Sequence, residues 1–175
     1  QEASLAVPLF LQEFERSGVS VWLRESPSVF GFYFVLVFHT IGLSLAVGPN
    51  TVIDLRLLGV ARDIPLAPLK RWFKIMWLGF AINVTSGMFL VFAYPIKALT
   101  NPVFYLKLMF IGIAVWIMRL IYTHAFNDAA LSAEVVGANV RKLAMWSLVF
   151  WLAAITAGRL LAYTCTYLVT GVPCE

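Results

Sequence analysis

Residues 28–47, SVFGFYFVLVFHTIGLSLAV, form an apolar stretch that decides the fold, and one histidine, His39, lies near its middle. No Lys, Arg, Asp or Glu occurs between Ser26 and Ile53. An uncharged stretch of this length predicts a helix that crosses the hydrocarbon core of a bilayer. A titratable ring at such a depth is energetically costly, so His39 is the first candidate for a functional residue.

The composition of the whole chain agrees with this stretch. Of its 175 residues, 61% are hydrophobic and 13% are charged, whereas a soluble domain has roughly 25% charged residues. The formal net charge is +4, but the basic residues flank apolar stretches and form no stripe with interleaved aromatics. That pattern is typical of membrane topology and argues against nucleic-acid binding. We therefore expect an all-α integral membrane protein.

The apolar stretches predict a four-helix bundle that covers residues 28–168, preceded by an interfacial segment and followed by a tail at 169–175. Residues 1–27 mix apolar and charged positions, which indicates an amphipathic helix on the membrane surface. Gly48, Pro49 and Asn50 loosen the end of the first span, although the helix can continue as far as Gly59. With these bounds, no span contains an Asp or Glu. The spans are expected at about 28–47, 73–94, 101–124 and 140–167.

Basic residues in the connections predict the orientation of the spans. The connection between the first and second spans is rich in Lys and Arg, and the connection before the fourth ends with Arg141 and Lys142, whereas the remaining one has only Lys97. The positive-inside rule then places both termini outward, in the periplasm if the membrane is a bacterial inner membrane. Cys165 and Cys174 fall at that outward end, where a disulfide is permitted; two free thiols are the alternative.

The chain has two histidines, His39 and His124, and a histidine pair in a membrane bundle suggests haem ligation. At 1.5 Å of rise per residue, however, their expected depths differ by roughly 16 Å, which one iron does not bridge. His124 is therefore expected at the cytoplasmic interface. For His39 two interpretations remain, an axial haem ligand or a hydrogen bond to a neighbouring helix, for example to Asn83 or Thr156.

Cations inside the spans favour a bound anion. Lys107 and Arg159 lie a few residues inside the outer ends of the third and fourth spans, in the same leaflet as His39. Such side chains either reach outward to the interface or bind an anion from outside the polypeptide, such as haem propionates, a quinone head group or a lipid phosphate. For a haem on His39, the second ligand is left open between Met109, Met88 and no protein ligand, with His124 less favoured.

Other catalytic patterns are absent from the sequence. It contains no GxSxG, Walker, GxGxxG or HExxH motif, so hydrolase, nucleotide-binding and zinc-protease functions have no support. A proton-coupled transporter would also need acidic residues inside its spans.

Two segments resemble a known family. FHTIGLSLAVGPNTVIDLRLLG, residues 38–59, and NPVFYLKLMFIGIAVW, residues 101–116, are similar to the first and third helices of a group of uncharacterised four-helix bacterial inner-membrane proteins. More distantly, the chain resembles the membrane protoporphyrinogen oxidase and copper-resistance membrane families, and in the former the corresponding histidine is thought to hold haem b. The resemblance implies roles for His39, Asp54, Arg56, Asn101 and Lys107.

The leading hypothesis is a membrane-embedded b-type cytochrome-like subunit that takes part in electron transfer. In it, haem b is held by His39, with Asn83 beside it and Lys107 and Arg159 near the propionates; a quinone is the second cofactor considered. Its partners would be the lipid bilayer and other membrane or periplasmic redox subunits. The alternative is a cofactor-free structural or assembly subunit of a larger membrane complex. A redox or structural subunit is favoured over an independent enzyme, although a membrane enzyme acting on a porphyrin or quinol would share the site.

Overall fold

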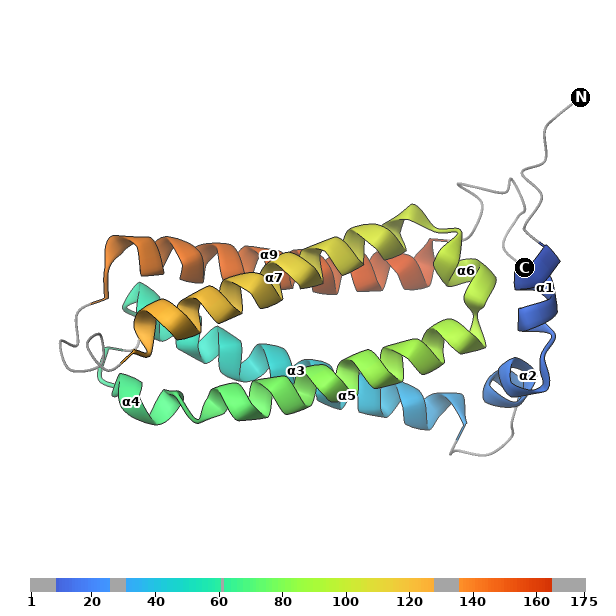
Figure 1. Ribbon diagram of the computed structural model, residues 1–175, viewed down its shortest axis with the longest axis horizontal. Helices are drawn as coiled ribbons and strands as arrows, with labels where there is room; N and C mark the ends of the chain where they lie inside the picture. Colours follow the sequence, from blue (N-terminus) through green and yellow to red (C-terminus); the bar gives the residue numbers. More distant parts are fainter. Residues whose placement is uncertain (1–8, 26–30, 61, 128–135, 165–175) are drawn as a thin grey trace, which may run out of the picture.

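The computed structural model describes residues 9–25, 31–60, 62–127 and 136–164, and most of these residues are helical, with no strand among them. The long helices lie side by side in an all-α bundle (Figure 1). They form four segments that are long and apolar enough to cross a membrane. The chain is thus a multi-pass membrane protein, with α3 (Phe32–Leu58), α4 (Leu66–Leu69) leading into α5 (Trp72–Ala93), α7 (Pro102–Ala125) and α9 (Ala138–Tyr163).

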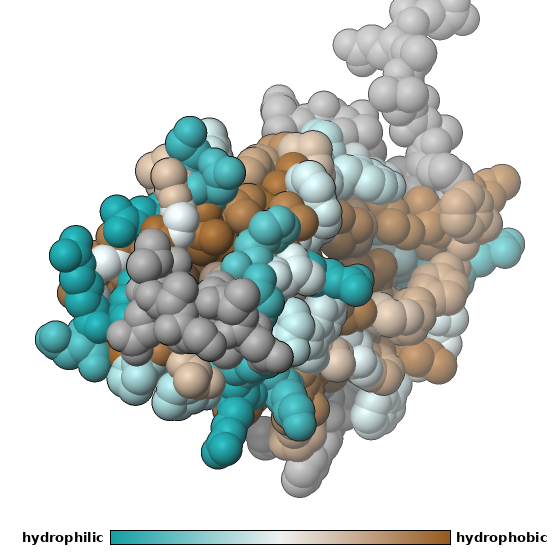
Figure 2. Space-filling model, turned by 60° about the vertical axis from the view of Figure 1, so that its left-hand side comes forward, coloured by the Kyte–Doolittle hydropathy of each residue, from teal (hydrophilic) through white to brown (hydrophobic). Residues whose placement is uncertain are grey.

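The long helices pack as two pairs. Helix α3 packs along α5, helix α7 packs along α9, and the pairs meet mainly through α3 and α9. A cluster of buried apolar side chains lies at the end of the bundle where α3 turns into α4. We call this the basic end, because Lys70, Arg71, Lys74, Arg141 and Lys142 lie there, and Figure 2 shows hydrophilic residues gathered over it. The cluster includes Ile53, Leu57, Leu69, Phe73, Met76, Ile121, Phe126 and Ala144.

The opposite end of the bundle carries α1 (Leu9–Glu15), α2 (Gly18–Glu25) and α6 (Pro95–Leu99) (Figure 1). The amphipathic segment expected at 1–27 is therefore two short helices where it is described, rather than one. Helix α2 is docked on α5 by Ser20, whose Oγ donates to the Phe92 carbonyl at 2.7 Å. Apolar side chains of these helices remain exposed, including Phe10 and Trp22, which suits a position at the membrane surface.

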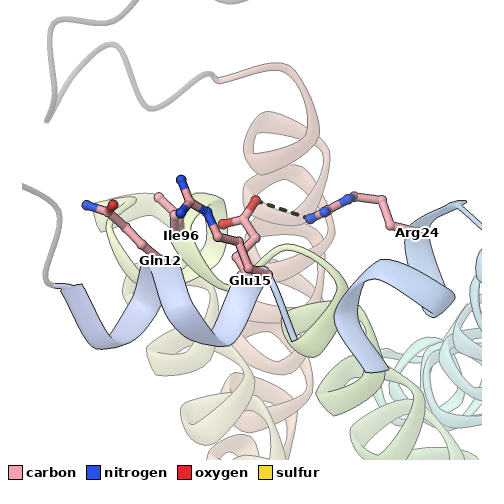
Figure 3. A pocket seen from close by; sticks show the side chains of 5 residues that line it. Gln12, Glu15, Arg24 and Ile96 are labelled. Atoms are coloured by element: carbon pink, nitrogen blue, oxygen red, sulfur yellow. Dashed lines mark hydrogen bonds and ion pairs between the residues drawn. The ribbon is translucent and has the colours of Figure 1, made fainter. Parts of the chain in front are cut away.

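A cavity of about 360 Å³ lies beside α1 and α2 at this end. Arg24 donates to Glu15 at 3.3 Å across it (Figure 3), and Gln12, Arg16 and Ile96 complete its lining. The Arg24 guanidinium also reaches the Ala93 carbonyl at 3.4 Å. These contacts fasten the amphipathic segment to the end of α5.

Helix α3 continues well beyond the expected end of the first span at residue 47. Pro49 lies inside this helix. Proline has no N–H and so loses one helical hydrogen bond, but a helix that is supported by neighbouring helices tolerates this loss. The helix ends in a Schellman motif, because Gly59 has φ +94° and the amides of Gly59 and Val60 donate to the Arg56 and Leu55 carbonyls at 3.1 and 3.0 Å. The expectation that no span contains an acid is therefore wrong, since Asp54 lies within α3 and is fully buried.

Two glycines allow α3 and α5 to approach closely. A Cβ atom on Gly42 would lie 2.6 Å from the Asn83 backbone N, and one on Gly79 would lie 2.7 Å from the Ala46 backbone N. Small residues at such crossings let membrane helices pack backbone to backbone. The close crossing brings the next turns of α5, which carry Asn83 and Ser86, against His39.

Candidate functional site

His39 lies on α3 in the half of the bundle away from the basic end, and its side chain is held by α5. Its Nδ1 is 3.1 Å from the Asn83 carbonyl oxygen and 3.1 Å from Ser86 Oγ. Since a carbonyl can only accept, Nδ1 carries the proton. Ser86 in turn donates to the Ile82 carbonyl at 2.7 Å, so its oxygen is free to accept from the same N–H. The contacts assign the tautomer in which Nε2 keeps its lone pair.

The Nε2 atom of His39 has no close hydrogen-bond donor among the described residues. Its contact there, with Asn83 Nδ2, is 3.5 Å long, which exceeds the usual range of about 2.7–3.2 Å for such bonds. The same Nδ2 makes a shorter bond of 2.8 Å to the His39 carbonyl. A histidine that donates one ring N–H to a backbone carbonyl and leaves the other nitrogen open has the arrangement typical of a metal ligand.

Lys107 on α7 shares this region with His39. Its side chain is half-buried, and it is close enough for its charge to act on the His39 ring. A Cβ atom on Gly158 of α9 would lie 3.5 Å from Lys107 Cε, so this glycine leaves room for the lysine stem. Among the residues that the structure describes, Lys107 Nζ has no hydrogen-bond or ion-pair partner. Arg159 follows Gly158 directly but is exposed.

The other residues considered from the sequence lie elsewhere. Met88 and Met109 are 55% and 51% exposed, on the outer faces of their helices. His124 is exposed in the last turn of α7 at the basic end, where its Nδ1 lies 2.8 Å from the Leu120 carbonyl. Thr156 donates to the Leu152 carbonyl of its own helix at 2.9 Å. The structure thus joins His39 and Asn83 by direct contacts, with Lys107 near enough for its charge to act on the ring, while Cys165 and Cys174 lie outside the described residues.

An apolar groove of about 390 Å³ adjoins the His39 site on the surface of α3 and α5. Ser86, which contacts His39 Nδ1, forms part of its wall, and Thr85 supplies a second hydroxyl. The remaining walls are aromatic and aliphatic, so the groove suits the apolar part of a ring or chain with a polar edge. Its lining comprises Phe34, Val35, Phe38, Ala81, Ile82, Thr85, Ser86 and Phe89.

A buried polar cluster between α3 and α9 was not predicted from the sequence. Asn50 Nδ2 donates to Asp54 Oδ2 at 2.6 Å and to Ser147 Oγ at 2.9 Å. Exposed fractions are 2% for Asn50 and 0% for Asp54 and Ser147. The sequence feature that could have predicted this cluster is the four-residue spacing of Asn50 and Asp54. This spacing places the two side chains on one face of a helix if α3 continues past Pro49.

We expect Asn50→Leu to destabilise the bundle because it removes a donor shared by Asp54 and Ser147. Leaving buried polar atoms without partners costs about 1–3 kcal/mol. The double variant Asn50→Leu/Asp54→Leu should recover part of that loss, because the stranded carboxyl is gone as well. Unfolding of the purified protein in detergent measures both effects.

Thr51→Val is the matched control for this prediction, since Thr51 bonds only to the Val47 carbonyl of its own helix among the described contacts. If the losses in unfolding free energy caused by the Asn50 and Asp54 substitutions simply add in the double variant, the two residues contribute independently. That result would contradict the coupling.

Comparisons with family models, with curated proteins and with solved structures found no match to this chain.

Proposed function

We propose that the chain is a membrane-embedded b-type cytochrome-like subunit that takes part in electron transfer, with haem b bound through His39. The observation that carries the proposal is the state of the imidazole. Its Nδ1 is held by the Asn83 carbonyl and Ser86, and its Nε2 has no donor closer than 3.5 Å among the described residues. When bound, the haem iron supplies a one-electron ferric/ferrous couple.

The residues around the imidazole have distinct roles in this proposal. His39 Nε2 is the ligand atom, and the Asn83 carbonyl and Ser86 Oγ fix the ring orientation and its tautomer. Lys107 is a cation whose charge acts on the ring, and it is suited to pair with a propionate. Arg159 is exposed beside Gly158 and reaches a propionate only at the rim of the site. The second axial position has no candidate among the half-buried residues that the structure brings to His39.

The proposed location is a bacterial inner membrane with both termini in the periplasm. The support is the clustering of Lys70, Arg71, Lys74, Arg141 and Lys142 at one end of the bundle, which the positive-inside rule assigns to the cytoplasm. His39 and Lys107 then lie in the periplasmic half, within reach of periplasmic or membrane redox partners.

The proposal is tested by a reduced-minus-oxidised absorption spectrum of the full chain, expressed with haem available and purified in mild detergent. We expect the sharp α and β bands of a b-type haem, at up to one haem per chain by pyridine haemochrome assay. A chain that purifies intact with no haem, and that takes up none when haem is added, would overturn the proposal.

The alternative function is that of a cofactor-free structural or assembly subunit, and one observation favours it. His39 and Asn83 are linked reciprocally, because the ring contacts the Asn83 carbonyl and Asn83 Nδ2 donates to the His39 carbonyl. Such a polar link stabilises a helix pair with no ligand. The exposed aromatic side chains of several helices, such as Tyr33 and Trp116, would then contact partner subunits as well as lipid.

A further inference from the structure

The Asn50–Asp54–Ser147 cluster contains buried atoms that the fold itself leaves without partners. Asp54 is fully buried, yet its Oδ1 has no hydrogen-bond partner among the described residues. Trp151, 4% exposed and one helical turn beyond Ser147, has an equally buried Nε1 with no partner there. An orphan acceptor and an orphan donor therefore flank the same polar contact between α3 and α9.

The two orphan groups lie on either side of one polar contact. Helices α3 and α9 run antiparallel (Figure 1), and Asn50 and Ser147 touch at 2.9 Å. Side chains lean toward the N-terminus of their own helix. Asp54 on α3 and Trp151 on α9 each stand one turn to the C-terminal side of this contact, so both lean back toward it from opposite directions. A single internal water bound to both would satisfy the acceptor and the donor.

No ion pair joins the Asp54 carboxyl to a Lys or Arg among the described residues. The side chains that act on it are those of Ser147 and Asn50, both uncharged. Arg56 lies two residues further along α3, and its Nε donates instead to the Ile64 carbonyl. Lys70 at the end of α4 is half-buried. The charged residues on the other helices at this end are exposed, namely Lys74 of α5, Arg119 of α7 and Arg141 and Lys142 of α9. A bare carboxylate in that setting is strongly disfavoured.

We propose that Asp54, with Asn50, Ser147 and Trp151, forms a proton-binding site within the basic half of the bundle, in which the carboxyl binds one proton and a water bridges it to the indole. Binding joins a proton from the aqueous side to a carboxylate oxygen and gives the neutral acid; release reverses this. Asn50 Nδ2 donates to Asp54 Oδ2 and to Ser147 Oγ. The site is independent of any haem on His39.

Infrared spectroscopy of the full-length protein in nanodiscs tests this proposal directly. The wild type should show the C=O stretch of a protonated carboxylic acid at neutral pH, which moves to lower frequency in D₂O. Labelling with [4-¹³C]aspartate should shift this band, which assigns it to aspartate without any substitution. The band should disappear in Asp54→Asn and persist in Asp63→Asn, the control at an exposed aspartate near the end of α3.

A second variant tests the water bridge. Trp151→Phe keeps an aromatic ring and removes the indole N–H, so the Asp54 band should stay but change frequency because the bridging water loses one partner. An unchanged frequency would overturn the bridge. Absence of the acid band in the labelled wild type, its persistence in Asp54→Asn, or its loss on adding Na⁺ would overturn the proton site. All readouts are made without haem, so they stand apart from the test of the cytochrome proposal.

Discussion

His39→Ala is expected to lose bound haem completely while keeping its helical content. The substitution removes Nε2, the one ring nitrogen of this site that retains a free lone pair. The main-chain hydrogen bonds of α3 and α5 remain, so the circular dichroism spectrum should change little. Haem per chain, measured by pyridine haemochrome assay after purification in detergent, is the readout.

His124→Ala is the matched control, because His124 is the other histidine of the sequence and lies exposed at the basic end of α7. Added imidazole should restore haem binding to His39→Ala and have no effect on His124→Ala, a result that a purely structural role for His39 does not produce. Haem retained by His39→Ala would contradict the ligand assignment. Unchanged assembly of the variant into its complex would then favour the structural subunit.

Ser86→Ala should give an intermediate result in the same assay. It removes one of the two acceptors of the His39 Nδ1–H and leaves the Asn83 carbonyl in place. Loss of such an orienting partner typically lowers metal affinity about 10–100-fold, so a haem titration should show weaker binding rather than none.

Gly42→Leu is expected to disrupt the contact between α3 and α5. A Cβ atom there would lie 2.6 Å from the Asn83 backbone N and 2.8 Å from the Gly79 carbonyl oxygen. Backbone atoms cannot rotate away as a side-chain tip can, so the helices must separate. Overpacking of this kind typically costs 1–3 kcal/mol, about as much as one good core contact contributes. Thermal unfolding in detergent should show a clearly lowered midpoint.

Gly48→Leu is the control for this prediction, because Gly48 lies on the same helix and a Cβ atom there meets nothing within 4 Å. Equal losses in both variants would show that the helix, rather than its crossing with α5, is sensitive to leucine. Gly42→Leu should also weaken haem binding, since separating the helices withdraws Asn83 and Ser86 from the His39 ring.

The approximate positions of the long helices could be predicted from the sequence, because a long uncharged apolar stretch is typical of a helix that crosses a bilayer. The expected bounds of 73–94 and 101–124 differ by one residue at each end from Trp72–Ala93 and Pro102–Ala125. The first helix reaches Leu58, in agreement with the longer of the two possibilities, a helix as far as Gly59, because Pro49 is tolerated where α5 and α9 support the helix. The burial of Asp54 was not predicted, because the expected span ended at residue 47.

The candidate site could be predicted only in part. His39 and Lys107 were visible as polar side chains in apolar surroundings, and Asn83 was considered as a partner of His39. Ser86 was not, because the rotation of α5 relative to α3 is set by the crossing at Gly42 and Gly79 and not by the local pattern of either helix. The exposure of Met88 on α5 depends on the same rotation.

The concentration of the apolar core at the basic end has a consequence for how the protein opens. Amide protons near Ile53, Met76 and Ile121 should exchange with solvent most slowly, whereas the half that contains His39 is held by fewer buried contacts and should open locally first. Under the cytochrome proposal, haem would enter through this half while the far end of the bundle stays intact. Insertion of the polypeptide and haem binding would then be separate events in time.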